Sequence, residues 1–271
     1  WAYDLFQRAK KDSDFNTFTF KTIDNSAIDE IAKEVSKAQQ EALSELEKIT
    51  FRQEYEASFE IVTGRPRFDL DTLNSLYLKK SECLEQDGLL QIFQSHDPYA
   101  KYIIGVDTSE GLITGDNSAA VVMNAKDYSI SAYYKGKLPP DSFASYLDTW
   151  GRKYNEALLV VEVNNHGLVT LNFLKENYPL LYYRKYFDEP ANIWTKKLGF
   201  QTNTKTKVWL IDKLDQAIRD GLKIKQSEIL DELKTYIIEE DGATNASEGS
   251  HDDLVIALAL CIQGYIELGT Y

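Results

Sequence analysis

Carboxylates stand at three places in this sequence where apolar neighbours predict burial. Asp107 ends the apolar run "YIIGV", and Glu162 lies inside "LLVVEVN". Asp252 and Asp253 directly precede "LVIALAL". A buried carboxylate is costly unless it is paired, hydrogen-bonded or bound to a cation. These acids therefore indicate either local structural roles or one shared functional site.

Each acid also has a local explanation. An aspartate after a strand often hydrogen-bonds its own turn, which could account for Asp107. Acids at a helix start complement the positive end of the helix dipole, which could account for Asp252 and Asp253. Glu162 is harder to explain locally because glutamate is depleted in strands; a buried salt bridge to a lysine is its alternative.

The pattern around these acids predicts a mixed sheet. Three short strands joined in series predict an antiparallel meander, and the later alternation of helix and strand predicts parallel crossovers. An apolar strand without polar alternation is expected to be covered on both faces. The strands expected are 102–106, 118–125, 128–136, 157–164 and 180–187, with helices at about 139–154 and 167–178. The predicted class is α/β, a mixed five-stranded sheet flanked by helices.

Outside the sheet the pattern is mainly helical. A helical segment is expected from Ser26 to Phe59, a boundary at "IVTGRPRFD", and a short helix over 69–80. Later segments comprise a polar loop or hairpin at 188–207, helices at about 210–221, 227–236 and 251–268, and a loop at 241–250.

Topology brings the acids together. In the predicted order the first and fourth strands are adjacent and parallel, so Asp107 and Glu162 leave the sheet at the same edge. The last helix can bring Asp253 or Asp252 there. Converging carboxylates repel one another, and divalent cations such as Mg²⁺, which prefer oxygen ligands, relieve that repulsion. CxxC, HExxH and paired histidines at metal spacing do not occur in the sequence, which argues against zinc.

Polar residues near the acids extend this site. "NNHG", from Asn164 to Gly167, offers polar side chains and a helix start for a phosphate. His166 and His251 could assist proton transfer, or could be turn and cap residues. His96 lies outside the predicted sheet and is given no role.

Charge is unevenly distributed. The formal net charge of −13 argues against a nucleic-acid partner, but residues 175–213 carry eight bases against four acids. Five lysines there are candidates for DNA phosphate contacts, with a solvated face as the alternative: Lys185, Lys196, Lys197, Lys205 and Lys207.

No apolar stretch reaches the ~18 residues of a membrane span. Two distant cysteines favour a reducing, intracellular setting. The chain begins at Trp1 without methionine, and we expect a fragment or a processed piece.

Four separated blocks resemble one family. The blocks are "GVDTSEG…GDNSAAVVM", "LLVVEVNNHG", "LGFQTNTKTKVWLIDKL" and "HDDLVIALALC". Their order resembles that of the RNase H-like nucleases and, among these, that of the C-terminal nuclease domain of the large terminase subunit of tailed bacteriophages. The resemblance implies three regions: 1–64 as the end of the terminase ATPase domain, 65–99 as a linker with a short helix, and 100–271 as the nuclease. The sequence contains no Walker A pattern, so we expect no ATPase activity from this chain alone.

The resemblance also implies roles. Asp107, Glu162 and Asp253 are the expected catalytic metal ligands, with Asp252 and Glu110 as further ligands, and the expected cofactors are two Mg²⁺ or Mn²⁺ ions. The implied activity is endonuclease cleavage of double-stranded viral DNA, at the initial and headful cuts of packaging. Implied partners are DNA, the small terminase subunit, the portal protein and the ATPase domain, in the host cell cytoplasm and without a membrane.

Other functions fit part of the pattern. An actin-like or sugar-kinase-type phosphotransferase uses a related sheet, and its phosphate loop resembles "GVDTSEG", but a second phosphate loop and a glycine-rich adenosine motif are missing from the sequence. A junction resolvase or transposase of the same superfamily, and a scaffold with structural acids, are further alternatives.

Overall fold

A mixed sheet forms the centre of the computed structural model, which describes residues 65–112, 116–188, 192–239, 242–247 and 249–269. The strands of this sheet run in the order β2 (Glu85–Asp87), β3 (Leu90–Ile92), β6 (Ser129–Gly136), β5 (Ser118–Asn124), β4 (Tyr102–Asp107) and β7 (Leu158–Val161). Strands β4, β5 and β6 form the predicted antiparallel meander, and β7 lies parallel to β4. The predicted α/β class with a mixed sheet between helices is confirmed.

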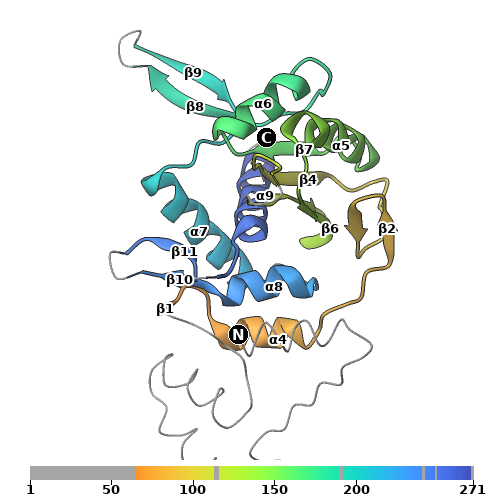
Figure 1. Ribbon diagram of the computed structural model, residues 1–271, viewed down its shortest axis with the longest axis vertical. Helices are drawn as coiled ribbons and strands as arrows, with labels where there is room; N and C mark the ends of the chain where they lie inside the picture. The colour runs from red at the N-terminus through yellow and green to blue at the C-terminus, as the bar shows by residue number, and fades with distance from the viewer. Residues whose placement is uncertain (1–64, 113–115, 189–191, 240–241, 248, 270–271) are drawn as a thin grey trace, which may run out of the picture.

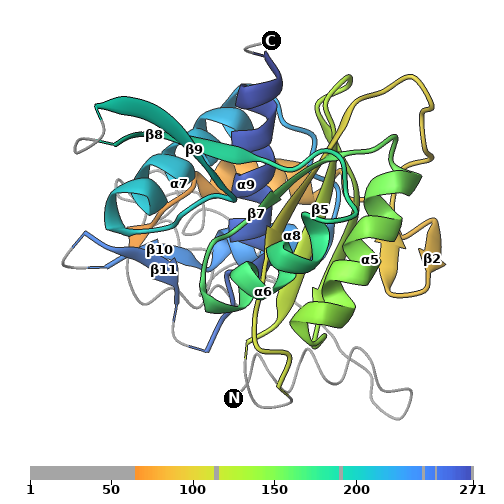
Figure 2. The ribbon, with the colours of Figure 1, turned by 90° about the horizontal axis from the view of Figure 1, so that it is seen from above.

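Helices cover both faces of the sheet (Figure 2). One face packs against α5 (Pro140–Lys153) and α6 (Asn165–Leu174); the other packs against α9 (Asp253–Gly269) and, beyond it, α7 (Thr204–Arg219), α8 (Ser227–Lys234) and α4 (Leu70–Tyr77). Alternate residues of each strand point to opposite faces. In β4, Ile103 lies on the α9 face, whereas Ile104 lies on the α5 face. The sheet is therefore buried on both sides, as its apolar strands predict.

The predicted fifth strand, 180–187, divides into two parts. Leu181 makes a single parallel bridge to Leu159 of β7. The chain then leaves the sheet as β8 (Tyr183–Asp188), which pairs antiparallel with β9 (Ile193–Leu198) in a hairpin that projects from the body of the protein (Figure 1). The charges of Arg184 and Lys185 oppose burial under a helical layer, which explains why this part stays outside the sheet.

Two groups of short strands were not predicted. Strands β2 and β3 extend the sheet at the edge beside β6, so pairing into the sheet begins before residue 100. The predicted loop 241–250 contains β11 (Thr244–Ala246), which pairs with β10 (Tyr236–Ile238), and β10 pairs with β1 (Arg65–Pro66). Strands of two or three residues give little periodicity to detect.

The remaining helix predictions agree with the structure except at α7, which begins at Thr204, before the predicted start at 210 and inside the segment predicted as a loop or hairpin; the Asn203 capping box fixes this earlier start. The short helix expected over 69–80 is α4, the basic segment 188–207 contains the β8–β9 hairpin, and α9 begins at Asp253. The helical segment predicted within residues 1–64 lies outside the described residues. The domain boundaries at residues 64 and 99 stay predictions. None of the described helices combines the length and apolar character needed to cross a membrane.

Candidate active site

Asp107 and Glu162 stand next to each other at the ends of adjacent strands. The parallel register pairs Val106 with Val161, and the Glu162 amide donates a hydrogen bond to the Val106 carbonyl at 3.0 Å. By strand alternation both side chains lie on the α9 face. Burial and then the neighbouring Glu162 carboxyl raise the pKa of Asp107 well above its usual value. The predicted pairing of these two acids is therefore present.

Helix α9 brings Asp253 to this edge because it approaches β4 very closely. Gly105 has no side chain to hold the helix away, and its amide donates to the Cys261 thiol at 3.1 Å. A Cβ at Gly105 would lie 1.9 Å from the Ala257 carbonyl oxygen. Asp253 lies one helical turn before Ala257. The close contact of Gly105 with α9 therefore fixes the position of the Asp253 carboxylate relative to β4.

The Asp253 carboxylate is buried and has its own partners. Its Oδ2 accepts a hydrogen bond from Asn117 Nδ2 at 3.3 Å and lies 3.8 Å from both Lys135 Nζ and His251 Nδ1. Burial raises the pKa of Asp253, whereas Asn117 and Lys135 oppose that rise. Asp253 also contributes to the raised pKa of Asp107, which places the two carboxylates in one electrostatic site.

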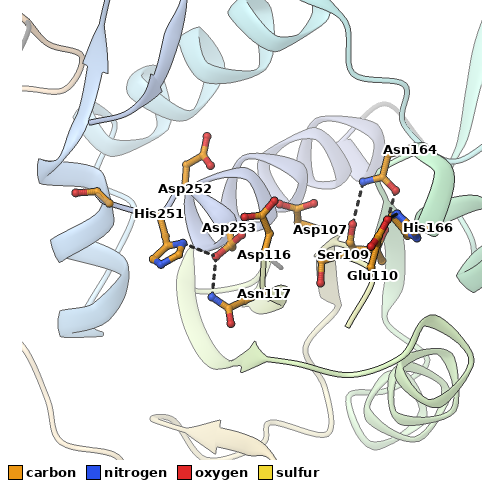
Figure 3. Close-up of a pocket in the computed structure, with 12 residues that line it drawn as sticks. Asp107, Ser109, Glu110, Asp116, Asn117, Asn164, His166, His251, Asp252 and Asp253 are labelled. Carbon is orange, nitrogen blue, oxygen red and sulfur yellow. Dashed lines mark hydrogen bonds and ion pairs between the residues drawn. The ribbon is translucent and has the colours of Figure 1, made fainter. Parts of the chain in front are cut away.

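These groups border an open polar pocket (Figure 3). Asp107 lies in its middle, with Asp116, Asn117 and Asp253 on one side and Glu110, Asn164 and His166 on the other. The residues lining the pocket are Asp107, Thr108, Ser109, Glu110, Asp116, Asn117, Asn164, His166, Ser250, His251, Asp252 and Asp253. Glu162 lies beside Asp107 but is not among the residues that line the pocket. The structure thus gathers the predicted acids and both candidate histidines at one place.

Asn164 connects the two strand ends. Its Nδ2 donates to the Thr108 carbonyl at 3.0 Å and to Glu162 Oε2 at 3.3 Å. Its Oδ1 caps α6 by accepting from the Gly167 amide at 2.7 Å. A Cβ at Gly167 would lie 1.8 Å from the Glu162 carbonyl oxygen, so a glycine is needed for α6 to start here. These contacts give Asn164 a positioning role; its predicted contact with phosphate stays a prediction.

The further predicted ligands and bases lie at the pocket rim. Glu110 Oε1 is 3.3 Å from His166 Nε2. Asp252 is partly exposed, and its Oδ2 lies 3.5 Å from Lys207 Nζ. Asp253 is more deeply buried than Asp252, with 6% of its surface exposed. That burial supports the preference for Asp253 as the main helix acid, which stays a prediction.

The candidate DNA-binding lysines fall into two groups. Lys185 and Lys196 are directly opposite each other in the hairpin, and Arg184 is opposite Lys197. Like charges opposite each other in a ladder are destabilising, which favours an anionic partner. Lys205 and Lys207 lie in the first turns of α7, where cations oppose the helix dipole. Lys207 lies close to the pocket, 3.5 Å from Asp252, whereas the hairpin projects from the body of the protein (Figure 1).

Sequence reasoning missed a second buried charge cluster. Lys135 of β6 donates a hydrogen bond to Glu232 of α8, and Glu232 is 6% exposed. Burial raises the pKa of Glu232 to about 7, with Lys135 opposing the rise. Asn117, another missed residue, holds Asp253. In the sequence, Lys135 ends a strand and Glu232 lies in an amphipathic helix, so neither residue carries a distinctive local signal.

A bound metal ion needs several donor side chains arranged around one point. Within the described ranges, no group of three or more His, Cys, Asp or Glu side chains is arranged so that it could hold one. The chemistry of the donors nevertheless fits a hard cation: Asp107 and Glu162 are half-buried carboxyls side by side, and Glu162 raises the pKa of Asp107. A third carboxylate, from Asp253, is at present directed to Asn117 and Lys135.

Comparison with known proteins identifies the family. The sequence model of the terminase RNaseH-like domain matches residues 104–263, from β4 to α9. The chain belongs to this family. The predicted relationship to terminase nuclease domains is therefore confirmed, and the matched stretch contains Asp107, Glu162 and Asp253. No curated protein matches the chain.

Solved terminase nucleases have the same fold. The large terminase nuclease of the thermophilic phage G20c with bound magnesium is 18% identical, with a TM-score of 0.55, covering 75% of this chain and 98% of that chain. The same nuclease with bound cobalt is 19% identical with a TM-score of 0.54, covering 75% and 98%. The large terminase nuclease domain of Thermus phage P74-26 is 18% identical with a TM-score of 0.53, covering 70% and 93%. Identities this low establish the terminase nuclease fold alone.

Proposed function

We propose that this terminase-family chain is a metal-dependent endonuclease that cuts double-stranded viral DNA during genome packaging, at the initial and the headful cut. One observation carries the proposal. Asp107 and Glu162 lie opposite each other on adjacent parallel strands, and α9 presents Asp253 to the same edge. A terminase fold in which carboxylates converge beside an open polar pocket is suited to phosphodiester hydrolysis at bound cations.

Asp107, Glu162 and Asp253 would hold two Mg²⁺ or Mn²⁺ ions, with Asp252 and Glu110 as further ligands. Bound there, the ions would lower the pKa of the attacking water and stabilise the leaving 3′-oxygen. The metals bound in the phage G20c nuclease, magnesium and cobalt, support a divalent cofactor. The chain's own contribution is to fix these carboxylates: Asn164 holds Glu162, and Asn117 and Lys135 hold Asp253.

The basic residues would bind the DNA backbone. Lys207 lies 3.5 Å from Asp252, so a phosphate held by Lys207 would lie beside the acids. The opposed pairs of the hairpin would contact phosphates farther along the duplex, giving affinity without sequence preference. His166 and His251 line the pocket, where they would accept or donate protons.

Wider roles follow from the family. The small terminase subunit, the portal protein and the ATPase domain are the proposed partners, and the host cytoplasm is the proposed place of action. Residues 1–64 are proposed to be the end of that ATPase domain.

Plasmid cleavage tests the function. The wild-type chain with Mg²⁺ or Mn²⁺ should convert supercoiled plasmid to nicked and linear forms with 5′-phosphate and 3′-hydroxyl ends. Asp107→Asn should fold normally and lose cleavage, whereas Asp148→Asn, on the exposed side of α5, should keep it. Wild-type cleavage by Asp107→Asn would contradict the assignment. ATP turnover by the wild-type chain would favour the phosphotransferase alternative.

A further inference from the structure

Helix α9 is capped by a side chain from another helix. The first turn of a helix has amide donors without helical partners, and an aspartate at the N-cap position usually accepts from them. Asp252 holds that position, because its carbonyl accepts the Ile256 amide at 2.9 Å. The Leu254 and Val255 amides instead donate to Oε2 of Glu232, at 2.8 and 3.3 Å.

The consequence concerns Asp252. Since Glu232 satisfies these two amides, the Asp252 carboxylate is not used as a cap. It lies instead on the pocket, 3.5 Å from Lys207 Nζ (Figure 3). Two acids in succession at the start of α9 can then both serve the pocket.

Lys135 completes the arrangement. Its Nζ donates to the other oxygen of Glu232, Oε1, and lies 3.8 Å from Oδ2 of Asp253. One ammonium group therefore links the capping carboxylate to the first residue of α9. Lys135 and Glu232 are both buried, with side-chain exposures of 12% and 7%, so solvent screens this link little.

We propose that Glu232 is a positioning residue of the nuclease: by capping α9 from α8 and pairing with Lys135, it holds Asp253 in place and leaves Asp252 free for the metal site. The inference rests on the proposed function of that site. It requires no contact between Glu232 and the ions, because the effect is transmitted through the first turn of α9. Outer residues that orient metal ligands typically change metal affinity by about 10–100-fold when replaced.

Glu228 provides a matched control. It lies one turn earlier on α8, 3.9 Å from Lys135 Nζ, and accepts a hydrogen bond from Tyr133 at 2.7 Å. The ion pair and the hydrogen bond of Glu228 are both made with side chains of β6. Glu228→Gln therefore makes the same chemical change on the same helix without affecting the cap.

The experiment measures Mn²⁺ binding directly, by calorimetry at pH 8, for the wild type, Glu232→Gln and Glu228→Gln. A glutamine has one acceptor oxygen and cannot serve both Lys135 and the α9 amides. We expect Glu232→Gln to weaken Mn²⁺ binding at least tenfold, with cleavage recovering as Mn²⁺ is raised, while Glu228→Gln binds as the wild type does. If Glu232→Gln does not fold, as judged by circular dichroism, Glu232→Asp, which withdraws the carboxylate by one methylene, is compared in its place.

The outcomes separate the two proposals. A wild type that binds no Mn²⁺ would refute the proposed metal site itself. A wild type that binds Mn²⁺, with a folded Glu232 variant that binds it within twofold of the wild type, would overturn only the positioning role. A lower melting temperature with an unchanged Mn²⁺ affinity would show that Glu232 is structural alone. Equal weakening by Glu228→Gln would also overturn the proposal, because it would trace the effect to lost charge near Lys135 and not to the cap.

Discussion

The close approach of β4 and α9 predicts a large effect from adding one methyl group at Gly105. A Cβ there would lie 1.9 Å from the Ala257 carbonyl oxygen, 2.6 Å from the Cys261 amide nitrogen and 3.0 Å from its sulfur. Cβ atoms in proteins essentially never approach another heavy atom more closely than 3.0 Å, so Gly105→Ala must separate strand and helix by at least 3.0 − 1.9 = 1.1 Å.

The energetic cost follows from what α9 buries. Its residues from Asp253 to Gly264 are all buried, so the helix cannot shift without disturbing the core on every side. Overpacking commonly costs 1–3 kcal/mol and sometimes more, and here the obstacle is backbone. We expect Gly105→Ala to lower the free energy of unfolding by about 3 kcal/mol, which corresponds to a melting temperature roughly 6–12 °C lower.

The same displacement should affect the chemistry. Moving α9 by about 1 Å moves Asp253 relative to Asp107, and misplacement of this size can cost on the order of 100-fold in rate. Thermal denaturation and plasmid cleavage well below the melting temperature measure the two effects. Gly269→Ala is the control, since nothing lies within 4 Å of a Cβ at the end of the same helix.

A second substitution tests the cause. Adding Cys261→Ala to Gly105→Ala should not restore stability, because the nearest obstacle is the Ala257 carbonyl and not the Cys261 sulfur. A Gly105→Ala protein that melts within 2 °C of the wild type would refute the described packing, and with it the argument that β4 fixes the position of Asp253.

Three more predictions concern the surroundings of the site. Burial raises the pKa of Glu232 from 4.5 to about 7, so the stability that this carboxyl contributes is present below pH 4.5 and is lost as the pH rises through 7. Between pH 5 and 7.5 the free energy of unfolding of the metal-free wild type, measured with denaturant, should fall by on the order of 2 kcal/mol more than that of Glu232→Gln. Equal decreases in the two proteins would contradict this prediction. Lys185→Gln with Lys196→Gln should reduce the slope of log binding constant against log salt for duplex DNA by about 1.8, and an unchanged slope would remove the hairpin from the interface. Asn164→Ala should lower stability by about 1 kcal/mol and slow cleavage, because it removes the α6 cap and the hydrogen bond to Glu162; full activity would show that Glu162 needs no such support.

Sequence reasoning found the features that depend on nearby residues. Asp107 and Glu162 stand out because each interrupts an apolar run, and the order of strands implies that they meet. The register between Val106 and Val161 confirms that placement. The start of α9 at Asp253 was predictable because an acidic pair precedes a long apolar stretch.

Features that depend on distant residues were not predictable. Lys135 and Glu232 are 97 residues apart, and each is an ordinary charge in its own segment. The departure of 180–187 from the sheet depends on whether a helical layer covers it. The charges of Arg184 and Lys185 oppose such burial, but the run does not show where the helices lie. Strands β2 and β3 form because β6 offers a free edge, and their three-residue lengths carry almost no pattern.

The central claim is that Asp107, Glu162 and Asp253 hold divalent cations together. Anomalous diffraction from crystals of the protein soaked in Mn²⁺ tests it most directly, because it locates the ions and their ligands. We predict two peaks beside Asp107, with Glu162 and Asp253 among the ligands of the ions. Both peaks should be lost in Asp107→Asn. Mn²⁺ bound elsewhere, or no peak among these three carboxylates at saturating Mn²⁺, would contradict the account.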